Sequence, residues 1–102
     1  MMIIYLIKNS EGFYKIGRTK NNAMDRLKQL QTGSSSELKL VKACNSEAGS
    51  KVESILHNRY KGYNVQGEWF DLPEKEVDTF EKNVSTITEM VMSLKKSGNP
   101  FI

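Results

Sequence analysis

The sequence has little of what marks disulfide-bonded, zinc-binding or membrane proteins. Its 102 residues include one cysteine, Cys44, and one histidine, His57. A single cysteine excludes an internal disulfide bond, and one cysteine with one histidine excludes a structural zinc site built from these residue types. No apolar run reaches the roughly 20 residues that span a bilayer. We therefore expect a protein of a reducing compartment that has no membrane partner.

Two further features are weak or missing. Residues 1–7 are apolar but have neither a basic start nor a small-residue cleavage site, so they predict a first strand and not a signal peptide. The net charge of +3 permits a polyanionic partner without requiring one. The basic residues are unevenly placed, however. Five of them fall close together in the first third of the chain: Lys15, Arg18, Lys20, Arg26 and Lys28.

The clearest local pattern is a β-hairpin near the N-terminus. Residues 3–17 contain two stretches rich in β-branched and aromatic side chains, separated by turn residues. A three-residue loop that closes with Gly12 in the left-handed conformation makes paired residue numbers sum to an even value. Side chains alternate along a strand, so this register places Tyr5 and Lys15 on one face, whereas a four-residue loop would separate them. We prefer the shorter loop because Gly12 stands where that loop needs a positive φ.

The remaining patterns predict one domain of the α/β (α+β) class. We expect a small three-stranded sheet, opened by the antiparallel hairpin and flanked by helices, with a long C-terminal helix. Asn21 or Asn22 is expected to cap the first helix, Ser46 to cap the second, and Cys44 to be a small core residue. The expected elements are a helix over residues 22–31, a strand over 38–44, a helix over 46–60 and a short strand or extended stretch over 67–72.

The strongest periodicity lies in the C-terminal helix. Residues 1–72 form the expected core, 73–97 the helix and 98–102 a tail. The apolar stripe of the helix consists of Val77, Phe80, Val84, Ile87, Val91 and Leu94. Spacings of three and four fit a helix packed on its own domain, and they also fit a homodimer seam through residues 77–94.

Five side chains are candidates for chemistry: Tyr5, Lys15, Arg26, Glu53 and His57. Taken singly, each has an ordinary structural explanation. Tyr5 can pack with its hydroxyl exposed, and Glu53 with His57 can be a surface pair one helical turn apart. Trp69 and Phe70 are interpreted as core residues, with a base-stacking platform for single-stranded nucleic acid as the alternative.

Taken together, the motifs resemble a known family. The segments IIY (residues 3–5) and KIG (residues 15–17), followed in order by DRLKQL, VESILH and GEWF, resemble the GIY-YIG nucleases, in particular their small phage and prophage branch. The resemblance covers about residues 3–72. It implies the fold of that family, metal-dependent cleavage of DNA phosphodiester bonds, and a cytoplasmic location in a bacterial or phage-infected cell.

The resemblance also implies roles for individual residues. Glu53 would ligate a divalent cation, Mg²⁺ or Mn²⁺, which prefers oxygen ligands. Tyr5 would activate the attacking water with help from Lys15, and Arg26 would stabilise the phosphate through its fork of donors. Sequence-independent contacts to the DNA backbone would come from Arg18, Lys20 and Lys28.

Three positions depart from the family pattern. Ile3 replaces the first glycine, Lys15 replaces the second tyrosine, and Leu30 stands where many relatives carry a histidine. His57 would then be the proton acceptor, because imidazole titrates near neutral pH. These departures leave two alternatives: a nucleic-acid-binding module that does not cut, and a protein-interaction or small-nucleotide-binding protein on the same scaffold.

Overall fold

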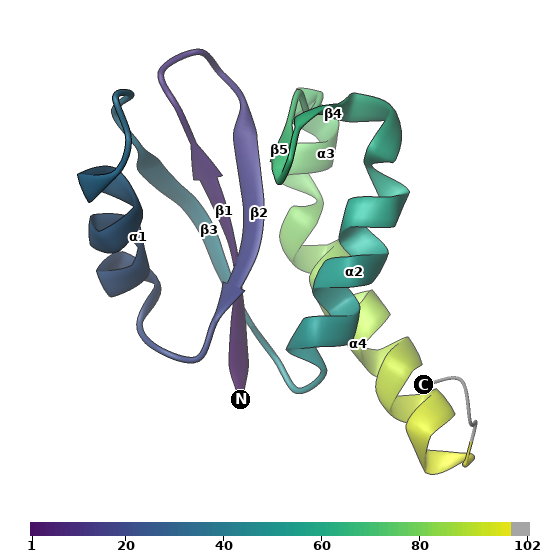
Figure 1. Ribbon diagram of the computed structural model, residues 1–102. Coiled ribbons are helices and arrows are strands. Elements are labelled where there is room, and N and C mark those ends of the chain that lie inside the picture. Colours follow the sequence, from purple (N-terminus) through teal and green to yellow (C-terminus); the bar gives the residue numbers. More distant parts are fainter. Residues whose placement is uncertain (99–102) are drawn as a thin grey trace.

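The computed structural model, described here for residues 1–98, is a five-stranded antiparallel sheet with helices on both faces (Figure 1). The expected α+β class is confirmed. The strand order is β3-β1-β2-β5-β4. The strands are β1 (Met2–Lys8), β2 (Tyr14–Thr19), β3 (Lys39–Ser46), β4 (Asn64–Gln66) and β5 (Trp69–Phe70). The helices are α1 (Ala23–Thr32), α2 (Gly49–Arg59), the short 3₁₀ helix η1 (Lys61–Tyr63), α3 (Glu74–Asp78) and α4 (Phe80–Lys96).

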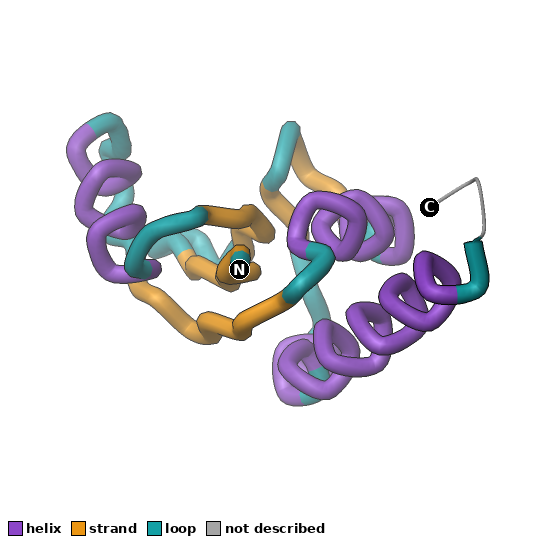
Figure 2. The backbone as a smooth tube through the Cα atoms, turned by 90° about the horizontal axis from the view of Figure 1, so that it is seen from below, coloured by secondary structure: helices purple, strands orange, loops and turns teal. Residues whose placement is uncertain are grey.

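Two hydrophobic cores lie on opposite faces of the sheet. Figure 2 shows α1 on one side of the strands and α2 with α4 on the other. The sheet contributes Tyr5 and Ile7 to the smaller core under α1, and Ile4, Leu6 and Ile16 to the larger core under α2 and α4. Successive residues of β1 therefore enter different cores, as the period of two in a strand requires.

The hairpin has the register that the sequence predicts. Tyr5 pairs with Gly17, so the numbers of paired residues sum to an even value. The amide of Asn9 donates to the carbonyl of Phe13 at 2.9 Å, and Gly12 has a φ of 90°. The three-residue loop is therefore confirmed, and with it the common face of odd-numbered residues in both strands.

The predicted three-stranded sheet needs a correction, because two short strands extend it beyond β2. β4 and β5 contain three and two residues, too few for a periodic pattern to be visible. They are joined through Gly67, whose φ of 56° suits a tight turn. β5 pairs with β2 through Tyr14–Phe70 and Lys15–Trp69. The open edge of β2 offers hydrogen-bond partners to β5, although the sequence of residues 67–72 predicts only a short strand or extended stretch.

One of the predicted helix caps is confirmed and one is wrong. The side chain of Asn22 accepts a hydrogen bond from the amide of Met24 at 2.7 Å, at the start of α1. Ser46 does not cap α2, because it is the last residue of β3 and α2 begins at Gly49. The hydroxyl of Ser46 shares a hydrogen bond of 2.8 Å with Thr88 on α4 and accepts one of 3.3 Å from the amide of Ala48, before α2 begins. Pairing with β1 continues β3 past the predicted boundary, so tertiary contact overrides a local capping preference.

The expected single C-terminal helix is divided at Thr79. The amide and the hydroxyl of Thr79 both bond to the carbonyl of Lys75, at 3.2 and 2.9 Å, which ends α3. Five residues of the predicted stripe lie in the larger core of the chain itself: Val77, Phe80, Val84, Ile87 and Val91. No helix within residues 1–98 is long and apolar enough to cross a membrane. The predicted tail lies outside the described residues from position 99 onward.

Candidate functional site

The candidate site lies at the outer edge of β2, where pairing with β5 stops. The last residue of β2 that pairs with β5 is Lys15. At Ile16 the amide donates to the carbonyl of Glu68 at 3.3 Å, and the carbonyl accepts from Nε2 of His57 at 2.8 Å. Beyond the end of β5, helix α2 lies beside β2 (Figure 1), and His57 of α2 bonds to the β2 backbone there.

Three groups that can bind a metal converge at this edge. Ligand atoms of Glu53, His57 and Glu68 all lie within 4.8 Å of one another, and we call these three residues the edge cluster. Glu53 and His57 stand one turn apart on the same face of α2, whereas Glu68 comes from the turn between β4 and β5. Two carboxylates and an imidazole form a donor set that fits a divalent cation such as Mg²⁺ or Mn²⁺.

Each carboxylate of the edge cluster already has a cationic partner on β2. Nη1 of Arg18 lies 2.7 Å from Oε1 of Glu53, and Nζ of Lys15 lies 3.2 Å from Oε1 of Glu68. The Glu53 side chain is 14% exposed and the Glu68 side chain 48%, so solvent screens the second pair more strongly. Oε2 of each glutamate bonds to no residue within 1–98, which leaves one oxygen of each carboxylate for a further ligand.

The imidazole of His57 is held in one orientation. Its ring packs edge-on against Phe70, with ring centroids 5.1 Å apart and an interplanar angle of 72°. A carbonyl oxygen can only accept, so Nε2 carries the proton in the bond to Ile16. Nδ1 is therefore the nitrogen that can accept a proton or bind a metal.

Tyr5 lies against β2 on the face of the sheet that α1 covers. Its ring lies across Gly17, so that a Cβ atom built on Gly17 would be 2.5 Å from Cζ of the ring. Gly17 stands in β2 between the residues that bind His57 and Glu53. Tyr5 is only 2% exposed, yet within residues 1–98 no fully buried polar side-chain atom lacks a partner. Because its hydroxyl bonds to none of those residues, the hydroxyl keeps contact with solvent.

The other candidates lie away from these contacts. Arg26 on α1 donates to Gln29 at 3.2 Å and forms no ion pair with any described residue. Lys20, in the loop after β2, and Lys28, on α1, are exposed. The convergence of Arg26 with the edge cluster stays a prediction, as do the DNA contacts of Lys20 and Lys28.

Comparison with known families adds an independent observation. The model of the T5orf172 domain matches residues 2–85, which include Tyr5, Arg18 and the whole edge cluster. The chain belongs to the T5orf172 family. The T5orf172 domain is phage-associated, and it is associated with nuclease-like and DNA-binding function. No curated protein and no solved structure gives a significant match.

Sequence reasoning missed one residue of this T5orf172 domain. Glu68 belongs to the segment GEWF, which was interpreted through its aromatic residues alone. The ammonium group of Lys15 bonds to Glu68 at 3.2 Å, and its expected action on Tyr5 stays a prediction. The available signal was a carboxylate inside a segment expected to be apolar. Such a residue needs either solvent or a partner.

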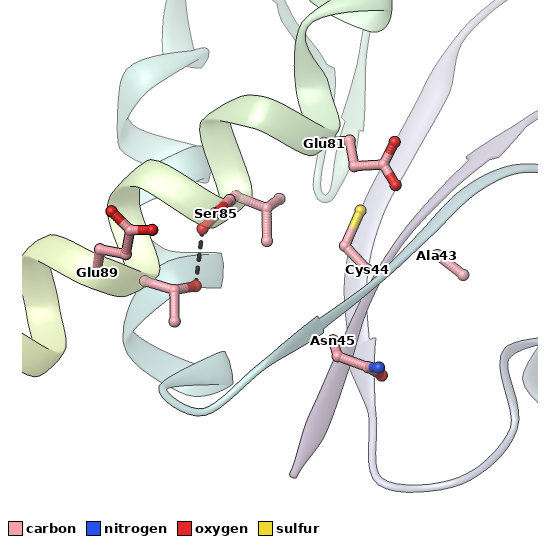
Figure 3. Close-up of a pocket in the computed structure, with 8 residues that line it drawn as sticks. Ala43, Cys44, Asn45, Glu81, Ser85 and Glu89 are labelled. Carbon is pink, nitrogen blue, oxygen red and sulfur yellow. Dashed lines mark hydrogen bonds between the residues drawn. The ribbon is translucent and has the colours of Figure 1, made fainter.

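A cavity elsewhere in the T5orf172 domain differs chemically from the edge cluster. It has a volume of about 350 Å³ and lies between β3 and α4, beside Cys44, Glu81 and Glu89 (Figure 3). Cys44 is buried in β3, as predicted. Burial, with a contribution from Glu81, raises the pKa of the Cys44 thiol to about 11. The thiol is therefore neutral near pH 7 and is a poor nucleophile.

Proposed function

We propose that this protein is a metal-dependent endonuclease that hydrolyses DNA phosphodiester bonds, with a mechanism like that of the GIY-YIG enzymes. The observation that carries the proposal is the edge cluster, with two carboxylates and an oriented imidazole, at the edge of the strand whose Gly17 the Tyr5 ring covers. Membership of a family associated with nuclease-like function supports it. The basic residues of β2 and α1 carry positive charge that would attract the phosphates of a DNA strand.

The carboxylates and the imidazole have different tasks in this proposal. Glu53 and Glu68 would hold the cation through carboxylate oxygens, since Mg²⁺ and Mn²⁺ prefer oxygen ligands. A divalent cation bound there would neutralise charge on the phosphate oxygens and acidify bound water. An imidazole that ligates a metal cannot also accept a proton at the same nitrogen. His57 therefore keeps Nδ1 for the proton.

The remaining groups position the reactants. The Tyr5 hydroxyl, which lies over Gly17 and keeps a small contact with solvent, hydrogen-bonds the attacking water. The proton of that water goes to Nδ1 of His57 as the new oxygen–phosphorus bond forms and the bond to the leaving strand breaks. Arg26 binds the phosphate with its planar donors. Fixed charges and dipoles of this kind supply a large part of the rate enhancement in many enzymes.

The test is nicking of supercoiled plasmid with Mg²⁺ or Mn²⁺. We expect Glu53→Gln to lower the nicking rate by about 100-fold or more, because the carboxylate that neutralises the cation is lost. Arg26→Ala should lower it as well. Glu89→Gln, an exposed carboxylate on α4, is the matched control and should cut at the wild-type rate. Wild-type activity in Glu53→Gln would remove Glu53 from the mechanism.

One observation favours a second candidate, a nucleic-acid-binding module that does not cut. Both carboxylates of the edge cluster are paired with cations of the chain, Arg18 and Lys15, which can replace a metal in neutralising them. This candidate predicts salt-dependent DNA binding with no nicking in any divalent metal.

A further inference from the structure

Two cavities lie next to Trp69, the residue that follows Glu68 of the edge cluster. Each has a volume of about 330 Å³, and Trp69, Ser34 and Ser35 line both of them. Lys15 lies in the first cavity and Gln66 in the second. The two cavities therefore adjoin along Trp69 and the loop between α1 and β3. Neither is part of the chemistry proposed above.

The register of β5 gives its two aromatic residues different environments. Trp69 pairs with Lys15 and faces the side of α1, whereas Phe70 pairs with Tyr14 and faces the larger core. Phe70 is 1% exposed, but Trp69 is only partly buried. The expectation that both are core residues therefore holds for Phe70 and is incomplete for Trp69.

The wall opposite Trp69 is ordered by hydrogen bonds. The side chain of Gln31 donates to the carbonyl of Ser36 at 2.9 Å and accepts from the amide of Leu38 at 2.7 Å. The hydroxyl of Ser34 donates to the carbonyl of Ser36 at 3.0 Å. The hydroxyl of Ser35 bonds to no residue within 1–98, so it is available to a ligand. Such a preformed wall lowers the entropic cost of binding.

These features fit a planar aromatic ligand with polar edges. The indole of Trp69 gives both cavities an apolar wall, while Ser35 and Gln66 offer groups that can both donate and accept hydrogen bonds. Nζ of Lys15 lies 5.8 Å from the centroid of the Trp69 ring and 3.2 Å from Glu68. An aromatic group placed against Trp69 would therefore be a neighbour of whatever the edge cluster binds.

We infer that Trp69 and the loop of residues 34–36 hold an unpaired base of the DNA strand that passes the edge cluster. This rests on the proposed function, because the phosphate of that strand is what the cluster would engage. A paired base cannot present its face to an indole, so the preferred substrate has a single-stranded or splayed nucleotide next to the cut. The inference makes GEWF a substrate-binding segment in which Glu68 contacts the cation and Trp69 the base.

The test uses the only tryptophan of the chain as the reporter. Intrinsic fluorescence is followed in EDTA, where metal-dependent cleavage cannot occur, during titration with a short oligothymidylate. We expect saturable quenching. An abasic oligonucleotide of equal length, which has the same phosphates without bases, and a duplex should quench much less. Equal quenching by all three would overturn the inference.

Variants test the same site through the anisotropy of a labelled oligothymidylate. Trp69→Leu should weaken binding about tenfold, the usual effect of losing one stacking platform, while Trp69→Phe should keep most of the affinity. Ser35→Leu narrows both cavities from the side of the loop, and it should weaken binding too. Tyr63→Leu removes an exposed aromatic group outside both cavities and is the control. If both Trp69→Leu and Ser35→Leu bind the oligothymidylate with wild-type affinity, the inference is contradicted.

The two proposals fail in different ways. Plasmid nicking without base-dependent quenching would leave the endonuclease and remove the base site. Base-dependent quenching without nicking in any metal would support the base site and favour the binding module over the endonuclease.

Discussion

The contact between Tyr5 and Gly17 allows a sharp test of how the hairpin positions its tyrosine. A Cβ atom added at Gly17 would be 2.5 Å from Cζ and 2.9 Å from Cε1 of the Tyr5 ring, and closer still to the hydroxyl oxygen. The ring cannot move aside easily, because Tyr5 is 2% exposed and packs in the smaller core. Gly17→Ala must therefore displace either the ring or the strand.

The expected cost follows from the geometry. Forcing one extra carbon into a packed site typically costs about 1–3 kcal/mol, a large part of the 5–15 kcal/mol that stabilises an average domain. The control is Gly62→Ala, because a Cβ at Gly62 meets nothing within 4 Å. That change should be neutral or stabilising by up to about 1 kcal/mol through the unfolded state. We therefore expect a lower urea midpoint for Gly17→Ala than for Gly62→Ala.

A double-mutant cycle identifies the cause. Tyr5→Leu removes the ring that the new Cβ would meet, so Gly17→Ala should cost much less in the Tyr5→Leu background. The expected coupling free energy is about 1–3 kcal/mol. If the two substitutions are additive, or if Gly17→Ala is as stable as Gly62→Ala, the close approach does not explain why glycine occupies position 17. If the protein nicks DNA, Gly17→Ala should also slow nicking because the hydroxyl moves.

Two further predictions concern the larger core. The pKa of Cys44, raised to about 11 from a reference of 9.0, means that the folded state favours the neutral thiol. The neutral thiol makes its full contribution to the free energy of unfolding below pH 9. That contribution falls as the pH rises toward 11, and about 2 kcal/mol of it is lost at pH 11. Urea unfolding should therefore show the advantage of wild type over Cys44→Ala shrinking between pH 8 and 11, and a constant difference would contradict the shift. Val84 is 1% exposed, so Val84→Glu should unfold the chain by circular dichroism while the exposed Thr86→Glu should not. If light scattering shows that wild type is a dimer and that Val84→Glu is a folded monomer, the result would instead indicate that residues 77–94 form a dimer seam.

Local chemistry explains which parts of the fold were predictable. Gly12 specifies the hairpin loop, the loop specifies the register, and the register decides that Tyr5 and Lys15 share a face. Asn22 caps α1 through an amide two residues away. Each of these features depends on near neighbours in the chain, so the amino-acid pattern alone is sufficient to predict it.

Other features depended on edges and surfaces that no local pattern describes. Ser46 has the chemistry of a helix cap but lies in β3, because β1 offers it a partner. The strands β4 and β5 form because β2 has an open edge. The helix breaks at Thr79, and Val77 and Phe80 on either side of the break both lie in the larger core.

The candidate site divides in the same way. Residue type and position in a strand or helix are enough to make Tyr5, Lys15, Glu53 and His57 candidates. The approach of Glu68 to Glu53 and His57, and the pairing of Arg18 with Glu53 across 35 positions of the chain, depend on tertiary packing. The physical reason is that α2 and β5 meet at one edge of β2, and that meeting depends on the packing of whole elements.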